Sequence, residues 1–189
     1  MPRPPVLPTI DWKHVLETAK TFDAWLQAGE NSENRNTIQA AIESQTLPPS
    51  VEAHLAALPR DVYVLAFAED WCGDVVRHVP VLERMARCSS RIHTRYVFRE
   101  ENKELFARYL TNGGEAIPKF IFLSDQYVEC GNWGPMPQPC KDLIARGKAV
   151  GDVAAARKKV ALLYEADADK RGVVNELLAL FDTAAALTV

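Results

Sequence analysis

An apolar run followed by a cysteine at the start of a helix constrains the fold of this chain more than any other stretch. Residues 62–67 form a continuous apolar segment of the kind that is buried in a central β-strand. A short acidic turn follows, and Trp71-Cys72-Gly73 then opens an amphipathic helix. Its apolar positions recur at helical spacing, namely Val76, Val79, Leu82 and Ala86. The sequence therefore predicts a strand–turn–helix unit with Cys72 at the helix N-terminus.

The position of Cys72 favours a reactive role for its thiol over a purely structural role in the core. Unpaired backbone N–H groups and the positive end of the helix dipole stabilise a thiolate at a helix N-terminus. The thiolate is the form that attacks disulfides and other soft electrophiles. The alternative is that Cys72 is a small buried apolar residue, as free cysteines often are.

The composition excludes several classes of protein. A chain of 189 residues with 48% hydrophobic and 25% charged residues is typical of a globular protein with one good core. The start, Met-Pro-Arg-Pro-Pro, lacks the apolar run of a signal peptide, and no stretch is apolar enough to span a bilayer. The net charge of -3 argues against nucleic-acid binding. We therefore expect a cytoplasmic protein that binds neither membranes nor nucleic acid.

The four cysteines, at positions 72, 88, 130 and 140, form neither a disulfide framework nor a zinc motif. We expect reduced thiols and no metal site. Six arginines between positions 77 and 99 accompany a single acid, Glu83. Four of them share one helical face by their spacing, namely Arg77, Arg84, Arg87 and Arg91. This pattern indicates either a solvated outer face or a surface that attracts an acidic partner or a small anionic thiol.

The order of the expected elements predicts an α/β fold. Helices are expected first, over residues 11–27, 36–45 and 50–58. Strands then alternate with helices, which implies a sheet covered on its faces. The expected strands are 62–67, 92–98, 119–123 and 127–133, and the expected later helices are 73–88, 101–110, 140–146, 152–166 and 173–187.

Three motifs, taken in order, resemble the thioredoxin family. They are Trp71-Cys72-Gly73 after a buried strand, Ile117-Pro118 before another apolar strand, and Trp133-Gly134-Pro135 after the last strand. The chain more closely resembles a bacterial thioredoxin-like branch that reads Trp-Cys-Gly-Asp-Cys, has a Trp-Gly-Pro element after the last strand and carries extra helices at both ends. The resemblance implies a thioredoxin-like fold, with a central mixed β-sheet flanked by helices. It divides the chain into an N-terminal helical extension (1–59), a thioredoxin-like core (60–148) and a C-terminal helical extension (149–189).

The resemblance also implies a site around Cys72. The Ile117–Pro118 bond is expected to be cis and to lie against the cysteine, with the backbone of Ile117 free to pair with an extended substrate. The residues expected to contact a substrate are Trp71, Gly73, Asp74, Ile117, Pro118, Trp133 and Gly134. Asp74 is expected to cap the helix, or alternatively to tune the cysteine.

One position departs from the family pattern. The second active-site cysteine of a dithiol enzyme would fall at position 75, and this chain has Val75. That second cysteine normally expels the substrate by closing an internal disulfide. Ala66 replaces a buried aspartate that many thioredoxins use to deprotonate the second cysteine, which is consistent with its absence.

We therefore expect a single-cysteine thiol–disulfide oxidoreductase in which Cys72 attacks a disulfide on a client protein or a small thiol. Glutathione or another low-molecular-weight thiol would release the product as a co-substrate, and no bound cofactor is expected. Cys140 is the only plausible internal resolving thiol. The alternative is a non-catalytic thioredoxin-fold module that binds proteins, and a weaker option is a glutathione-dependent iron–sulfur site shared by two subunits. Dimerisation through the helical extensions is possible.

Overall fold

A four-stranded mixed sheet organises the fold. The computed structural model describes residues 9–187, so the proline-rich start and residues 188–189 lie outside the description. The strands are β1 (Val62–Phe67), β2 (Ile92–Val97), β3 (Lys119–Leu123) and β4 (Glu129–Trp133). Their order in the sheet is β2-β1-β3-β4. β1 runs parallel to β2, whereas β3 is antiparallel to both β1 and β4. The mixed sheet expected from the sequence is confirmed.

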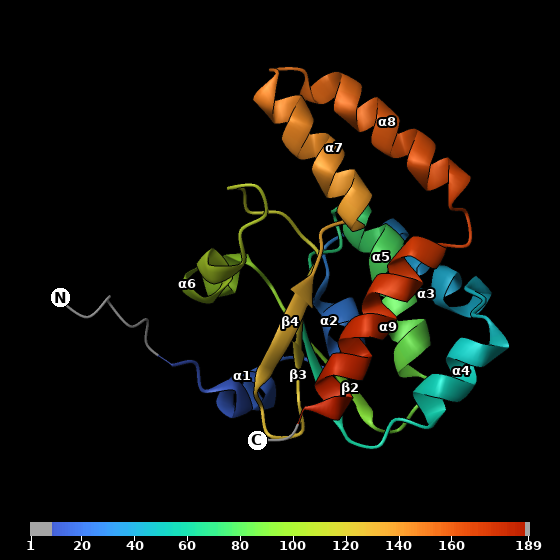
Figure 1. The fold of residues 1–189 in the computed structure, drawn as a ribbon. Coiled ribbons are helices and arrows are strands. Elements are labelled where there is room, and N and C mark those ends of the chain that lie inside the picture. Colours follow the sequence, from blue (N-terminus) through green and yellow to red (C-terminus); the bar gives the residue numbers. More distant parts are fainter. Residues whose placement is uncertain (1–8, 188–189) are drawn as a thin grey trace, which may run out of the picture.

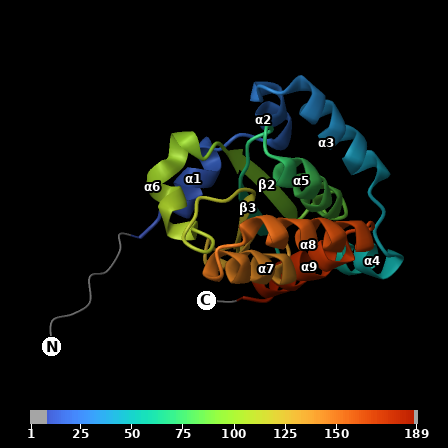
Figure 2. The same cartoon turned by 90° about the horizontal axis from the view of Figure 1, so that it is seen from above.

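Helices cover both faces of this sheet. Their bounds are α1 (Trp12–Thr18), α2 (Phe22–Ala28), α3 (Ser32–Ser44), α4 (Pro49–Ala56), α5 (Gly73–Ala86), α6 (Lys103–Phe106), α7 (Gln138–Ala149), α8 (Val153–Ala166) and α9 (Arg171–Ala186). α1 and α6 lie on one face, and α5 and α9 lie on the other (Figures 1 and 2). α7 and α8 form a hairpin that projects beyond the end of the sheet where β4 ends (Figure 1). Within residues 9–187, every helix is too short or too polar to cross a lipid bilayer.

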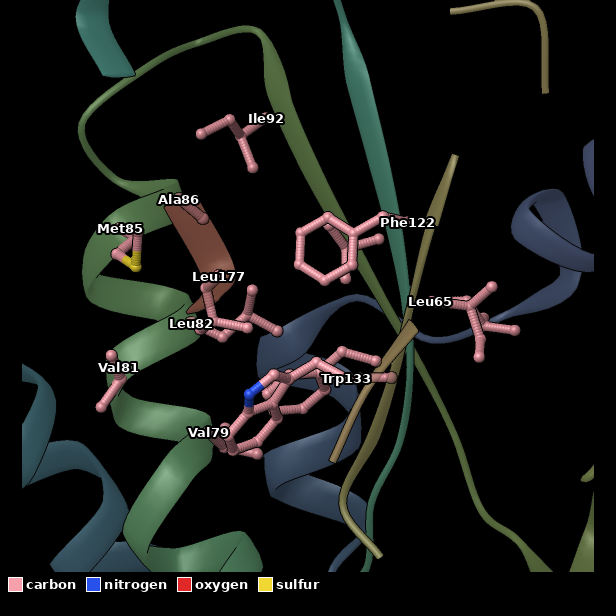
Figure 3. Packing of buried hydrophobic residues seen from close by; sticks show 14 of the residues in the cluster. Leu65, Val79, Val81, Leu82, Met85, Ala86, Ile92, Phe122, Trp133 and Leu177 are labelled. Atoms are coloured by element: carbon pink, nitrogen blue, oxygen red, sulfur yellow. The ribbon is translucent and has the colours of Figure 1, made fainter. Parts of the chain in front are cut away.

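The main core lies between α5, the sheet and α9. Val79 and Leu82 of α5 point toward Phe122 of β3 and Trp133 of β4 (Figure 3). Leu177 of α9 closes the same cluster, and all five side chains are at most 2% exposed. The C-terminal helix is therefore part of the core and not an appendage on its surface.

The prediction of a single helix over residues 11–27 is wrong, because this segment forms two helices, α1 and α2. Lys20 breaks it by pairing its backbone with Tyr96 at the edge of β2, through N–O distances of 2.9 and 2.8 Å. Thr21 then caps α2, since its hydroxyl accepts a hydrogen bond from the backbone N–H of Ala24 at 3.3 Å. Similarly, α3 begins at Ser32 and not near 36, because the Asn31 side chain accepts from the N–H of Asn34.

Three of the four arginines expected on one helical face pair with carboxylates. Arg84 pairs with Glu52, Arg87 Nη1 lies 2.6 Å from Glu43 Oε1, and Arg91 pairs with Asp61 at 3.4 Å. These carboxylates belong to α3, α4 and the segment before β1. The three arginines therefore help to hold the N-terminal helices.

Replacing Phe181→Ala tests whether α9 is integral to the core. Phe181 is fully buried and packs edge-on against Phe122, with ring centroids 5.0 Å apart. We expect the free energy of unfolding to fall by about 3–5 kcal/mol in one cooperative transition, measured by urea denaturation. The control Leu162→Ala removes an exposed side chain of α8 and should change it by about 0.5 kcal/mol or less. Separate unfolding of residues 149–189 ahead of the sheet would contradict this description.

Candidate active site

Cys72 lies where β1 has ended and α5 begins, facing the loop that precedes β3. It occupies the N-cap position of α5, and its side chain is partly exposed. The Ile117–Pro118 peptide bond is cis. The Sγ atom of Cys72 donates to the carbonyl oxygen of Ile117 at 3.5 Å. The fold therefore brings together the cysteine and the proline loop, although 45 residues separate Cys72 from Ile117.

The electrostatics of Cys72 differ from the expectation. Burial raises the pKa of the Cys72 thiol, and the carboxylates of Asp74 and Glu69 raise it further. Hydrogen bonds from the backbone N–H groups of Val75 and Asp74 oppose this shift and do not overcome it. Burial and these two carboxylates therefore favour the neutral thiol of Cys72, opposite to the effect that the helix N-terminus alone would have.

Buried apolar side chains occupy the two positions associated with a second active-site cysteine, namely Val75 and Ala66. Val75 is completely buried in the core one turn into α5, and Ala66 is completely buried in β1. Both side chains pack in the hydrophobic cluster that joins α5 to the sheet. The site therefore presents a single sulfur, that of Cys72, with aliphatic packing beneath it.

Trp71 and Gly73 form the open side of the site. Trp71 is 54% exposed, and the guanidinium of Arg99 lies 6.0 Å from its ring centroid. A Cβ placed on Gly73 would meet no other atom of residues 9–187 within 4 Å. These two neighbours therefore leave room for a partner to approach the sulfur.

Asp74 does not cap α5, contrary to expectation. Its carboxylate oxygen Oδ1 accepts a hydrogen bond from the hydroxyl of Tyr164 on α8, at 3.0 Å. The Tyr164 oxygen lies 3.2 Å from Nε2 of His78. Burial lowers the pKa of His78 to about 3, so the ring is neutral and its Nε2–H can donate to that oxygen. Burial also raises the pKa of Asp74.

Tyr164 is the functional contact that the sequence did not reveal. Arg77 holds it a second way, because the Arg77 Nη2 donates to the Tyr164 carbonyl oxygen at 2.9 Å and the guanidinium lies 4.1 Å from the ring centroid. In the sequence, Tyr164 belongs to the apolar face predicted for the C-terminal helix. It is separated from Asp74 by 90 positions along the chain. No local pattern could have indicated this pairing.

The Trp133-Gly134-Pro135 element supports the proline loop from behind. Trp133 is 2% exposed, stacks on Phe120 and donates from Nε1 to Glu176 at 2.6 Å. The expected contact of Trp133 with a substrate is not compatible with this burial. Gly134 lies directly against Pro118, because a Cβ at Gly134 would fall 2.0 Å from the Pro118 carbonyl oxygen.

Cys140, the expected internal resolving thiol, is more enclosed than Cys72. It is 3% exposed near the start of α7, whereas Cys72 is partly exposed. Burial and the charges of Asp74 and Glu176 raise the pKa of Cys140. Its burial disfavours attack on a disulfide at Cys72.

Lys119 is a buried cation beside the proline loop that the sequence presented only as the first residue of a strand. It is 4% exposed, and its Nζ donates to the Thr111 hydroxyl at 2.7 Å and to the Gly134 carbonyl at 3.2 Å. Burial, together with the charge of Lys141, lowers the pKa of Lys119 to about 8. Both acceptors are neutral oxygens, so the ammonium lies at the site without a counter-ion among these partners.

Removing the charge of Asp74 should activate Cys72. Asn keeps an oxygen that accepts from Tyr164, so Asp74→Asn changes the charge with little change in shape. We expect the pKa of Cys72 to fall and its alkylation by iodoacetamide at pH 7 to accelerate about three- to tenfold, measured on the Cys72 peptide by mass spectrometry. The control Glu104→Gln removes an exposed charge on α6 and should leave the rate unchanged. An unaltered or slower rate in Asp74→Asn would refute the assigned effect of this carboxylate.

Lys119 should make stability depend on alkaline pH. Its pKa is lower in the folded protein (about 8) than its ordinary value of 10.5, so the unfolded chain binds more protons between these values. Stability gained from this group therefore rises with pH through that window. Relative to Lys119→Met, the wild type should gain on the order of 1–2 kcal/mol between about pH 7.5 and 9.5, measured by denaturant titration. Lys158→Met, which removes an exposed lysine, is the control; a pH-independent difference for Lys119→Met would contradict the assignment.

Comparison with known proteins identifies the family. A family model described as thioredoxin matches residues 19–154. A Pseudomonas aeruginosa protein whose title gives its function as unknown has a similar structure, with a TM-score of 0.70 and 18% identity over 92% of this chain and 98% of that one. An HIV epitope-scaffold has a TM-score of 0.68 and 16% identity over the same shares. No curated protein matches the sequence.

The two structural neighbours show that the fold continues through the helices at both ends, since the alignments cover nearly the whole of each chain. The family match spans β1, α5, the proline loop and β4, which position Cys72 and the cis-proline, and it ends before Tyr164 of α8. The resemblance that the sequence motifs indicated is confirmed. The chain belongs to the thioredoxin family.

Proposed function

We propose that this protein is a single-cysteine thiol–disulfide oxidoreductase. The observation that carries the proposal is the partly exposed Cys72 sulfur, 3.5 Å from the Ile117 carbonyl, with the buried Val75 where a second cysteine would stand. Cys72 is partly exposed, and the backbone of the cis-proline loop facing it lies outside the strand ladder, which begins at Lys119, although the Ile117 side chain is buried. An extended client segment pairs with that backbone beside the sulfur.

The reaction consists of two exchanges. The Cys72 thiolate attacks one sulfur of a client disulfide, so a Cys72–client disulfide forms and the other client sulfur leaves as a thiolate. An external thiolate then attacks the client sulfur of this mixed disulfide. A new disulfide forms between the client and the external thiol, and Cys72 leaves as a thiolate.

The raised pKa of Cys72 shapes this reaction. A thiol of high pKa is present as a thiolate in a small fraction at neutral pH, but that thiolate is strongly nucleophilic. The same thiol is a poor leaving group, so the mixed disulfide persists once it has formed. These properties support a protein that captures a client sulfur and holds it, in place of one that donates a disulfide to clients.

The second candidate is a thioredoxin-fold binding module without turnover. The raised pKa of Cys72 favours it, because a protonated thiol does not attack disulfides. The exposed Trp71 would then serve as a contact for a protein partner. Cys72→Ser separates the two functions, because a binding module keeps its partner and an oxidoreductase loses the covalent complex.

Exposure to a disulfide should label Cys72. After incubation with hydroxyethyl disulfide we expect an adduct on the Cys72 peptide, with a rate that rises about tenfold per pH unit below the pKa of Cys72, followed by mass spectrometry. Cys72→Ser should abolish this adduct, and Cys140→Ser should not change how long it lasts. An oxidised wild type that contains a Cys72–Cys140 disulfide, or no adduct on Cys72 at any pH, would overturn the mechanism.

A further inference from the structure

A cavity of about 450 Å³ lies beside Cys72, between the proline loop and the α7–α8 hairpin. Its wall includes Ile117, whose carbonyl oxygen contacts the Cys72 sulfur, and Asp74, two residues beyond that sulfur. Apolar side chains supply much of the remaining wall, among them Met136, Ile144 and Val160. Small-molecule sites in proteins typically have volumes of about 300–1,000 Å³ and such mixed linings.

Three cations line this cavity, and the projecting hairpin supplies all of them. Lys141 and Lys148 belong to α7, and Arg157 belongs to α8. Across residues 9–187, none of the three lies within salt-bridge distance of a carboxylate. The Nζ of Lys148 donates to a neutral acceptor, the backbone carbonyl of Asn112, at 3.1 Å. The charges of Lys141 and Lys148 are therefore available to a ligand, and Arg157 lies near enough to Asp74 to counter the rise in the pKa of that carboxylate.

Two carboxylates also line the wall. Asp74 accepts a hydrogen bond from the neutral Tyr164 hydroxyl, and Glu115 lies 3.9 Å from Arg99. A further cation stands behind the wall, because the buried Lys119 ammonium donates to Thr111, which lines the cavity. The three cations in the wall therefore outnumber its two carboxylates, and the wall includes Ile117, whose carbonyl oxygen contacts the Cys72 sulfur.

We propose that this cavity binds the anionic portion of a small thiol while its sulfur is joined to Cys72. The thiol is of the class that carries two or more carboxylate or phosphate groups, which Lys141, Lys148 and Arg157 bind through charge-assisted hydrogen bonds. This inference rests on the proposed function and defines its substrate. The preferred substrates are mixed disulfides between a client protein and such a thiol.

The proposed reaction cycle regenerates the Cys72 thiolate without a second cysteine. The Cys72 thiolate attacks the small-thiol sulfur of client–S–S–R, a Cys72–S–S–R bond forms with R in the cavity, and the client leaves as a thiolate. A second R–S⁻ attacks the R sulfur, so R–S–S–R forms and Cys72 leaves as a thiolate. One client–S–S–R and one R–SH thus become client–SH and R–S–S–R.

The test compares disulfides of different charge on the full chain. Oxidised glutathione is the anionic probe, hydroxyethyl disulfide is the neutral probe, and each rate of adduct formation on Cys72 is divided by the rate with a free thiol in solution. We expect a normalised preference of about tenfold for oxidised glutathione. The double variant Lys148→Gln/Arg157→Gln should lose most of this preference while its rate with hydroxyethyl disulfide stays the same.

Matched controls exist on the same two helices. Arg146→Gln on α7 and Lys159→Gln on α8 each remove an exposed cation that does not line the cavity. They should change the preference less than about twofold, because exposed charges outside the cavity are screened by solvent and salt. Equal losses in these controls would mean that only the general charge of the hairpin acts, and the cavity assignment would be wrong.

A variant without the sulfur separates binding from reaction. S-methylglutathione, which cannot exchange, should bind saturably to Cys72→Ser, and the added Lys148→Gln/Arg157→Gln pair should abolish this binding. Absence of binding, or a wild type that reacts equally fast with both disulfides, overturns the cavity assignment and leaves the proposed function standing. Failure of Cys72 to react with either disulfide ends both.

Discussion

The close approach of Gly134 to Pro118 is the constraint on which the site depends. With a φ of +119° and no room for a Cβ, only glycine allows the chain leaving β4 to lie against the Pro118 carbonyl. The preceding residue, Ile117, contacts the Cys72 sulfur. β1 ends, β3 begins and β4 ends at the same edge of the sheet, because β3 is antiparallel to its two neighbours. Sheet topology thus places sulfur, proline and glycine together.

A single carboxylate couples the C-terminal hairpin to the sulfur. Asp74 raises the pKa of Cys72, and the hydroxyl of Tyr164 on α8 fixes the position of Asp74. Arg77 and the neutral His78 hold Tyr164 in turn. The hairpin therefore contributes to the environment of the thiol through Asp74, after the larger effect of burial, and it forms one wall of the neighbouring cavity, although it lies outside the central sheet (Figure 1).

The features that could be predicted from the sequence are those that depend on residues close together in the chain. The apolar run of β1, the helical spacing in α5 and the family motifs placed Cys72 at a helix start and the cis-proline opposite it. The break at Lys20 could not be predicted, because it follows from pairing with the distant Tyr96. The raised pKa of Cys72 was missed for a similar reason, since burial depends on how the whole chain packs. A helix-dipole argument considers only the helix itself.

The burial of Lys119 and the Asp74–Tyr164 hydrogen bond belong to the same class of tertiary facts. A lysine at the start of a strand ordinarily reaches solvent, and nothing near Lys119 in the sequence indicates that Thr111 and Gly134 enclose its ammonium. The charge pattern in the sequence also gave an incomplete description of the arginines between positions 77 and 91. The arginine spacing indicated either a solvated face or an attractive basic surface, and it did not indicate that Arg84, Arg87 and Arg91 pair with carboxylates from earlier segments.

The valine buried beneath the cysteine has a kinetic consequence. A dithiol enzyme ejects its client in a unimolecular step whose rate is independent of its surroundings. In the proposed single-cysteine cycle, Val75 occupies that place, so each exchange requires a collision with a separate molecule. Under that proposal the lifetime of a captured client varies inversely with the concentration of reduced thiol around the protein, and the thiol pool sets the rate of release.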